Sequence, residues 1–209
     1  MLVTALEPES RAGGGRVHVD GKPYGTVAPA DVAVLRLAVG DALDDVRLAA
    51  LVRRAEVFAA YVVALHVLRS RALPAPEIAR RLVRKGHARE AAETAVGALV
   101  AAGLIDDAEF ARHYARTRAR RRGFGPGRLV RDLRRFGIAE REAEAAVREA
   151  LASEGLKPGA LAREAAARKL KGLAGLDRTA RERRLRAYLL RRGFARADVI
   201  EAIREALGK

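Results

Sequence analysis

Apolar and polar residues alternate near the start of the chain, as in a β-strand with one buried face. Val17 and Val19 show this period of two, an Asp-Gly pair follows, and apolar character returns at Val27. This order predicts a β-hairpin, although Pro23 and the length of the connection leave its turn type open. Residues 1–12 show no such period, and we expect them to be disordered.

Helical patterns replace this alternation from Pro29 onward. The segment that starts there predicts a short helix, because proline suits the first helical turn, and Gly40 marks the break after it. Asp44 is then placed to cap a long helix that runs from about residue 45 to about residue 71.

Three later segments repeat one pattern, which indicates a structural unit used three times. Each has a glycine at the same place, at Gly86, Gly137 and Gly193. A leucine precedes each glycine by four residues, at Leu82, Leu133 and Leu189. The residues directly after the glycines are His87, Ile138 and Phe194, and an apolar residue recurs ten positions beyond each glycine, at Val96, Val147 and Ile203.

The middle copy shows how the unit is built. Asp106 can cap a first helix, which ends at Gly123. A Gly-Pro pair at 125–126 suits the start of a second helix, and Gly137 fits the left-handed residue that ends it. A third helix is expected over about 140–151. Short helices cannot all bury their apolar faces alone, so we expect each unit to be a three-helix bundle that contacts its neighbour.

The expected fold is therefore mainly α-helical. It is a tandem repeat of three three-helix units in an elongated arrangement, preceded by a small N-terminal segment with the β-hairpin. The expected N-terminal segment comprises residues 1–55 and includes the start of the long helix. The three repeats are expected at residues 56–105, 106–155 and 156–209.

The charge balance points to a polyanionic partner. The chain carries a net charge of +15, and its pI is near 11.2. Residues 1–55 are neutral, so residues 56–209 hold the whole excess. Nucleic acid, a membrane surface or an acidic protein face would each suit. The chain has no cysteine, no apolar run of the roughly 18 residues that a membrane span needs, and no signal-peptide pattern, so we expect a cytoplasmic protein without a membrane partner.

No motif for catalysis or for cofactor binding is recognisable. The three glycines at 13–15 lack the lysine and the following helix of a phosphate loop. The four histidines do not have a metal-ligand spacing. Asp106 and Asp107 suit helix capping better than a catalytic carboxylate pair. We therefore expect a protein that is not an enzyme and that binds no cofactor or metal.

Arginines are the candidate binding residues. Residues 116–135 contain nine arginines and a single acid, Asp132. They are either a surface for a polyanion or the solvated side of ordinary helices. A solvated face usually interleaves acids for ion pairing, whereas here the acids collect on the third helix, which favours binding. One row on the second helix comprises Arg128, Arg131 and Arg135. Phe124 is the aromatic ring placed among them for stacking on a base or contacting a partner.

The central repeat resembles the RecX family, bacterial regulators of the RecA recombinase. The resemblance rests on GLIDDAEFARHYARTRARRRGFGPGRLVRDLRRFGI and on the flanking echoes LVRKGH and LLRRGF. It covers about residues 56–207, and the hairpin segment resembles an extension present in some members. Two residues depart from the family pattern: His87 stands where an aromatic or aliphatic residue is usual, and Ala139 where an acidic cap is usual.

The resemblance implies a regulator that catalyses nothing itself. It would act as a monomer and bind the RecA filament and single-stranded DNA, with double-stranded DNA as a further candidate. It would inhibit RecA strand exchange, ATP hydrolysis and coprotease action. Recombination and SOS repair would be modulated in this way. The residues expected to contact RecA or DNA are Arg84, Lys85, Arg116, Arg120, Arg121, Arg122, Phe124, Arg128, Arg131, Arg134, Arg135, Arg191 and Arg192.

Two other functions fit parts of the pattern. Three-helix units with a basic helix also occur in helix-turn-helix proteins, so a stand-alone basic helical DNA-binding module is the alternative. Arginines spread over two helices and a loop speak against it. A repeat scaffold without nucleic acid is a third possibility, and the net charge of +9 over residues 156–209 speaks against that.

Overall fold

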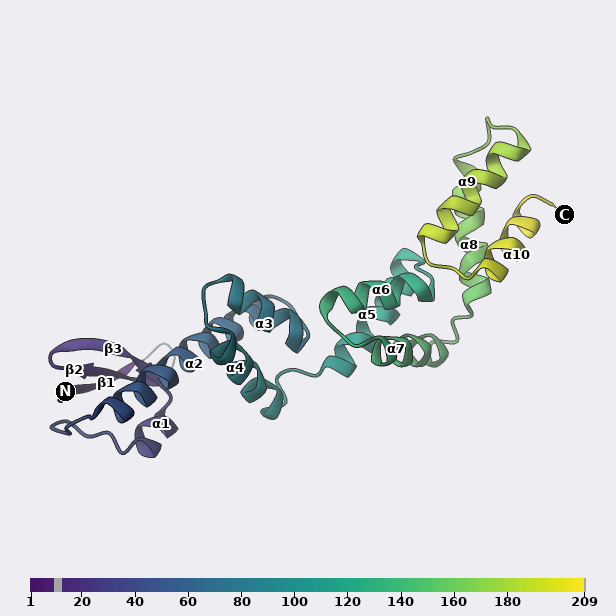
Figure 1. Ribbon diagram of the computed structural model, residues 1–209. Helices are drawn as coiled ribbons and strands as arrows, with labels where there is room; N and C mark the ends of the chain where they lie inside the picture. The colour runs from purple at the N-terminus through teal and green to yellow at the C-terminus, as the bar shows by residue number, and fades with distance from the viewer. Residues whose placement is uncertain (10–12, 209) are drawn as a thin grey trace. The chain divides into compact units, whose positions relative to one another are not determined.

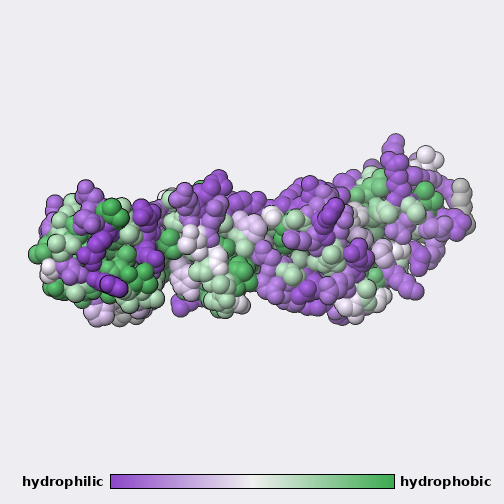
Figure 2. Space-filling model, turned by 60° about the horizontal axis from the view of Figure 1, so that its bottom comes forward, coloured by the Kyte–Doolittle hydropathy of each residue, from purple (hydrophilic) through white to green (hydrophobic). Residues whose placement is uncertain are grey.

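The computed structural model describes residues 1–9 and 13–208, which form three strands and ten helices (Figure 1). The chain divides into two compact units, Met1–Ile105 and Asp106–Lys209. The mainly helical fold with a small N-terminal β-segment is confirmed. On the face shown in Figure 2, hydrophilic side chains cover much of each unit, and smaller hydrophobic patches lie between them.

The N-terminal segment is a three-stranded antiparallel sheet. Its strands are β1 (Val3–Glu9), β2 (Gly14–Val19) and β3 (Lys22–Val27), in the order β1-β2-β3. The predicted hairpin is confirmed between β2 and β3. Asp20 and Gly21 connect them with φ of 49° and 75°, the pair of positive values that a type I′ turn requires.

The expectation of disorder over residues 1–12 is wrong for Val3–Glu9. This segment pairs with β2, so main-chain hydrogen bonds from a neighbouring strand, and not its own side-chain pattern, fix its conformation. Residues 10–12 lie outside the described residues. The short helix predicted after Pro29 is present as α1 (Pro29–Val34) and ends earlier than expected, before Gly40.

Helix α2 (Asp45–Ser70) begins as predicted at Asp44, whose carboxylate accepts a hydrogen bond of 2.7 Å from the Arg47 amide. Leu51 and Ala55, from its first half, are buried against the valines of the sheet. Its later part packs against α4. One helix therefore completes the sheet core and also supplies the first helix of a three-helix bundle.

Nine helices form three successive bundles. The first consists of α2, α3 (Ala75–Arg84) and α4 (Arg89–Ala101). The second consists of α5 (Asp107–Arg122), α6 (Pro126–Phe136) and α7 (Glu140–Ser153). The third consists of α8 (Pro158–Lys171), α9 (Arg178–Arg191) and α10 (Arg196–Ala206). In each bundle the first and third helices pack on each other.

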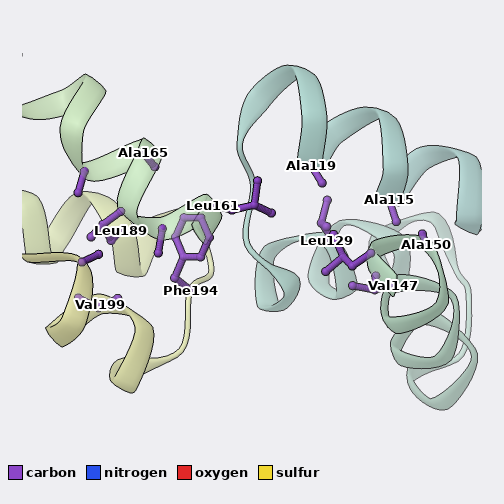
Figure 3. Close-up of a cluster of buried hydrophobic side chains, with 14 of the residues drawn as sticks. Ala115, Ala119, Leu129, Val147, Ala150, Leu161, Ala165, Leu189, Phe194 and Val199 are labelled. Atoms are coloured by element: carbon purple, nitrogen blue, oxygen red, sulfur yellow. The ribbon is translucent and has the colours of Figure 1, made fainter. Parts of the chain in front are cut away.

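These first-to-third interfaces are rich in alanine. In the second bundle the buried face of α5 consists of Ala111, Ala115 and Ala119, and α7 opposes it with Ala143, Ala146 and Ala150. Figure 3 shows labelled side chains of α5–α7 in one group and those of α8–α10 in another. Leu129 and Leu133 hold α6 against this pair, and both are fully buried. Small side chains allow close approach of the two helices, and there is little room for larger ones.

The three aligned glycines are equivalent helix stops, as predicted. Gly86, Gly137 and Gly193 have φ of 98°, 97° and 83°. The amide of the residue directly after each glycine donates to the carbonyl of the aligned leucine, from Ile138 to Leu133 at 3.2 Å in the second bundle. The glycine amide donates to the carbonyl three residues before it. Together these bonds form a Schellman motif three times over.

Within the second unit, the end of α9 is joined to the start of α6 through the main chain. The Gly125 amide donates to the Arg192 carbonyl at 2.8 Å, and the Gly127 amide donates to the Gly193 carbonyl at 3.0 Å. The Arg192 guanidinium donates back to the carbonyls of Arg122 and Gly123. Gly127 lies in the first turn of α6, where amides lack helical partners, so the neighbouring bundle satisfies this donor.

A partly buried ion cluster stabilises α3. Glu77 is 12% exposed and accepts hydrogen bonds from Arg81 at 2.7 Å and Arg80 at 2.8 Å, and Arg84 lies 3.6 Å away. Burial alone would raise the pKa of Glu77, but the hydrogen bond from Arg81 and the three positive charges outweigh it, and the pKa is lowered.

Gly193→Ala should destabilise the protein more than Gly86→Ala. Alanine at 86 would carry only the penalty of positive φ, about 1 kcal/mol, because no atom lies within 4 Å of an added Cβ. At 193 the added Cβ would also collide with the Arg128 backbone, including Cα at 2.8 Å. Chemical denaturation of both variants measures the difference, and equal losses would contradict the main-chain joint.

Glu77→Gln should lower the free energy of unfolding near neutral pH by about 1 kcal/mol, because the charged acceptor of the arginine hydrogen bonds is lost. A depressed pKa stabilises the folded state above the unfolded value of about 4.3, and this contribution disappears as the pH falls through the folded value. The gap between variant and parent should therefore close in acid. Glu93→Gln, at an exposed pair 3.9 Å from Arg89, is the matched control and should change little.

Candidate polyanion interface

Positive charge is concentrated in the second unit. Residues 106–209 contain 27 Lys or Arg and 15 Asp or Glu, whereas residues 1–105 contain 14 and 11. Counting alone, however, treats all arginines as equivalent. Their ion pairs and exposure divide them into groups with different capacities to bind a partner.

The arginines on the middle of α5 are paired within their own bundle. Arg116 lies 3.8 Å from Glu154, and Arg120 donates to the same carboxylate at 2.9 Å. Arg112 approaches Glu149 at 3.8 Å. The sequence showed acids collected on the third helix, and packing of α7 on α5 brings Glu149 of that helix, and Glu154 directly after it, to the arginines. Arg116 and Arg120 therefore already have internal counter-charges.

The predicted row on α6 is also divided. Arg128 lies 3.6 Å from Asp132, and Arg135 lies 3.9 Å from the same residue. The Tyr114 hydroxyl donates to Asp132 at 3.2 Å, and the pKa of Tyr114 is raised by burial and by this carboxylate. Arg131 is exposed, and no acid pairs with it among the described residues.

Arg134 pairs with Glu140 across the α6–α7 turn at 3.0 Å. It therefore resembles Arg116 and Arg120, because an acid of α7 already lies beside it.

Phe124 is half-buried in the loop between α5 and α6 and packs against the core. The Arg128 guanidinium lies over its ring, 3.9 Å from the centroid, and that of Arg192 lies 5.7 Å from it. A nucleic-acid base could stack on the covered face only after Arg128 moved. The ring thus contributes to the joint between the second and third bundles.

The remaining arginines gather where α5 and α9 end. Arg121 and Arg122 are in the last turn of α5, and Arg191 is in the last turn of α9. All three are exposed, and none has an acidic partner among the described residues. Arg192 contacts the carbonyls of Arg122 and Gly123, so the two helix ends lie together. We call Arg121, Arg122, Arg191 and Arg192 the junction cluster.

The junction cluster suits an anionic ligand. The C-terminal ends of α5 and α9 carry the partial negative charge of the helix dipoles. This charge stabilises the arginines there without an acidic partner. Exposed guanidinium groups without counter-charges can bind phosphate or carboxylate in bidentate fashion. Arg168, which sequence reasoning missed, reaches the same loop, because its Nη2 would lie 2.9 Å from a Cβ at Gly123. The basic last turn of α8 was the signal for it.

Two predicted residues lie in the first unit, at the end of α3. Arg84 lies near Glu77, as described above, and Lys85 is exposed. Across the described ranges 1–9 and 13–208, no helix has the length and apolar character to cross a membrane. No group of three His, Asp or Glu side chains in those ranges is arranged to hold a metal ion.

Comparison with known proteins gives a consistent result. Residues 106–147 match the family described as RecX, second three-helix domain. The chain is 35% identical over 136 residues to regulatory protein RecX of Chlorobium limicola, a match that covers 65% of this chain and 80% of that protein. It is 33% identical over 144 residues to regulatory protein RecX of Pelodictyon phaeoclathratiforme, covering 68% and 84%.

A solved structure supports the same assignment. The crystal structure of a regulatory protein RecX superposes with a TM-score of 0.76 at 25% identity, covering 99% of this chain and 98% of the other. The relatives match over more than two thirds of their own length, and the solved structure shares the sheet-containing segment as well as the helices. The chain therefore belongs to the RecX family.

Proposed function

We propose that this protein binds the RecA–DNA filament and inhibits the recombinase, ATPase and coprotease activities of RecA, so that it modulates recombination and the SOS response. Family membership supports a regulatory role. The observation that carries a direct interaction with the filament is the junction cluster, in which Arg121, Arg122 and Arg191 are exposed and have no acidic partner among the described residues. Action as a cytoplasmic monomer that performs no catalysis is part of the proposal.

Successive bundles suit a partner with repeated subunits. Several weak contacts made by one chain act together, because binding of one bundle raises the effective concentration of the next at its own site. The net charge of +12 over residues 106–209 would also increase the rate of encounter with an anionic filament. Exposed arginines can then contact DNA phosphates or acidic side chains of RecA. Arg84 and Lys85 would add contacts from the first unit.

A stand-alone DNA-binding module is the second candidate, because the same cluster would bind the phosphates of free DNA. The two functions differ in what the protein must recognise. A DNA-binding module should bind free DNA and should act on RecA only by competing for it. A filament regulator should inhibit ATP hydrolysis on preformed RecA–single-stranded DNA filaments, where the DNA is already covered.

The triple substitution Arg121→Glu, Arg122→Glu and Arg191→Glu should abolish inhibition of ATP hydrolysis by preformed filaments. The control triple is Arg141→Glu, Arg183→Glu and Arg184→Glu, which makes the same charge change at exposed positions outside the cluster and should retain inhibition. If phosphates are contacted, affinity for single-stranded DNA should also fall. The slope of log affinity against log salt should become shallower by about 0.7 per lost contact.

If the cluster contacts an acidic face of RecA, DNA affinity should survive while inhibition is lost. Unchanged inhibition and unchanged DNA affinity in the folded test triple would show that these arginines are only solvated surface. Wild-type protein that leaves the filament ATPase untouched would contradict the proposed function itself.

A further inference from the structure

A groove separate from the junction cluster lies between α6 and α7. It has a volume of about 690 Å³. Its floor is apolar and comprises Val130, Val147, Leu151 and Leu156. Val147 and Leu151 are core residues, 2% and 5% exposed, so the floor is held rigid by the packing beneath it. The groove size is typical of sites that bind a compact ligand.

The rim of the groove is mainly cationic. Arg131, Arg148 and Lys157 line it, and none has an acidic partner among the described residues. Arg134 also lines it but is paired with Glu140 at 3.0 Å. A ligand that placed carboxylates at this rim would meet three cations that have no internal counter-charge.

The equivalent face of the first bundle has a similar hollow of about 460 Å³ between α3 and α4. Aligned on the helix-stop glycines, Ala79 and Arg80 of that hollow correspond to Val130 and Arg131. In the third bundle, Leu190 and Ile200 occupy the positions of Arg134 and Glu144, and they are 43% and 54% exposed. Exposed apolar side chains thus recur on this face, at Val83 in the first bundle and at Leu190 and Ile200 in the third.

We infer that the α6–α7 groove binds a segment of a partner protein in which one apolar side chain is flanked by carboxylates. The apolar side chain would lie on Val130 and Leu156, and the carboxylates would pair with Arg131, Arg148 and Lys157. A nucleic acid fits less well, because the floor offers no aromatic ring for base stacking.

This inference extends the proposed function by giving the chemistry of a protein segment that the regulator would recognise. It does not depend on the junction cluster, which lies at the ends of α5 and α9. Of the residues proposed for RecA or DNA contact, only Arg131 and Arg134 line the groove.

A direct test uses the full chain and a fluorescein-labelled synthetic peptide with a central leucine between glutamates. Fluorescence anisotropy should show saturable binding. Replacing the leucine of the peptide by serine, or its glutamates by lysines, should abolish it. Arg131→Glu combined with Arg148→Glu should weaken binding about tenfold or more, equivalent to about 1.4 kcal/mol. Arg141→Glu with Arg183→Glu, outside the groove, is the matched control and should bind normally.

Val130→Thr tests the floor, because it keeps the shape of the side chain and adds a hydroxyl group. It should weaken binding of the leucine peptide while circular dichroism remains unchanged. If Val130→Thr does not fold, the arginine variants still decide the matter.

Three results would overturn the inference. They are absence of peptide binding, equal binding of the leucine and serine peptides, and displacement of the peptide by a single-stranded oligonucleotide whose own affinity depends on Arg131 and Arg148. The first of these, with normal inhibition of RecA filaments, would remove the groove proposal and leave the proposed function. Peptide binding without inhibition of RecA filaments would support the groove proposal and contradict the proposed function.

Discussion

Close packing of alanine faces is the constraint on which each bundle depends. When the first and third helices meet through residues such as Ala115 and Ala150, their axes come near each other and leave no internal space. The second helix must then lie on the outside of the pair, attached by one leucine stripe. Its other face remains largely in solvent. The positions of the arginines on α6 and of the α6–α7 groove follow from this arrangement.

Charge in the second unit has two physical roles that composition cannot separate. Arg116 and Arg120 neutralise the carboxylate of Glu154, directly after α7, and help to fix α5 on α7. Arg121 and Arg122 continue the same helix, are exposed, and have no such partner among the described residues. Exposed pairs contribute little to stability, so the first group affects the fold modestly. Arg121 and Arg122 instead determine the electrostatic potential that an approaching anion meets within a screening length of about 8 Å.

Local rules made much of the fold predictable from sequence. Asp44 and Asp106 cap their helices and Gly137 ends α6 because each effect involves residues only a few positions apart. The repeated leucines could be recognised for the same reason, because each lies four residues before its glycine. Strand β1 was missed because its conformation depends on pairing with β2.

The candidate site was only partly predictable, because pairing depends on tertiary packing. Arg120 and Glu154 are 34 residues apart, so only the packing of α7 on α5 shows that they meet. The contact of Phe124 with Arg192 joins two bundles and depends on tertiary packing in the same way. The arginine-rich segment could be recognised from sequence. Which of its members remain available to a partner could not.

The joint between α9 and α6 has a consequence for how such a chain can diverge. Amide and carbonyl groups are common to nearly every residue, so this contact makes no demand on side-chain chemistry beyond the absence of a Cβ. An added Cβ at Gly125 would lie 2.7 Å from the Gly193 carbonyl oxygen, and one at Gly127 would lie 3.1 Å from it. Substitutions elsewhere on the surrounding surface therefore leave these main-chain bonds intact as long as the glycines are kept. The preference for a partner can therefore change while Gly125, Gly127 and Gly193, which have no Cβ, maintain this contact between the two bundles.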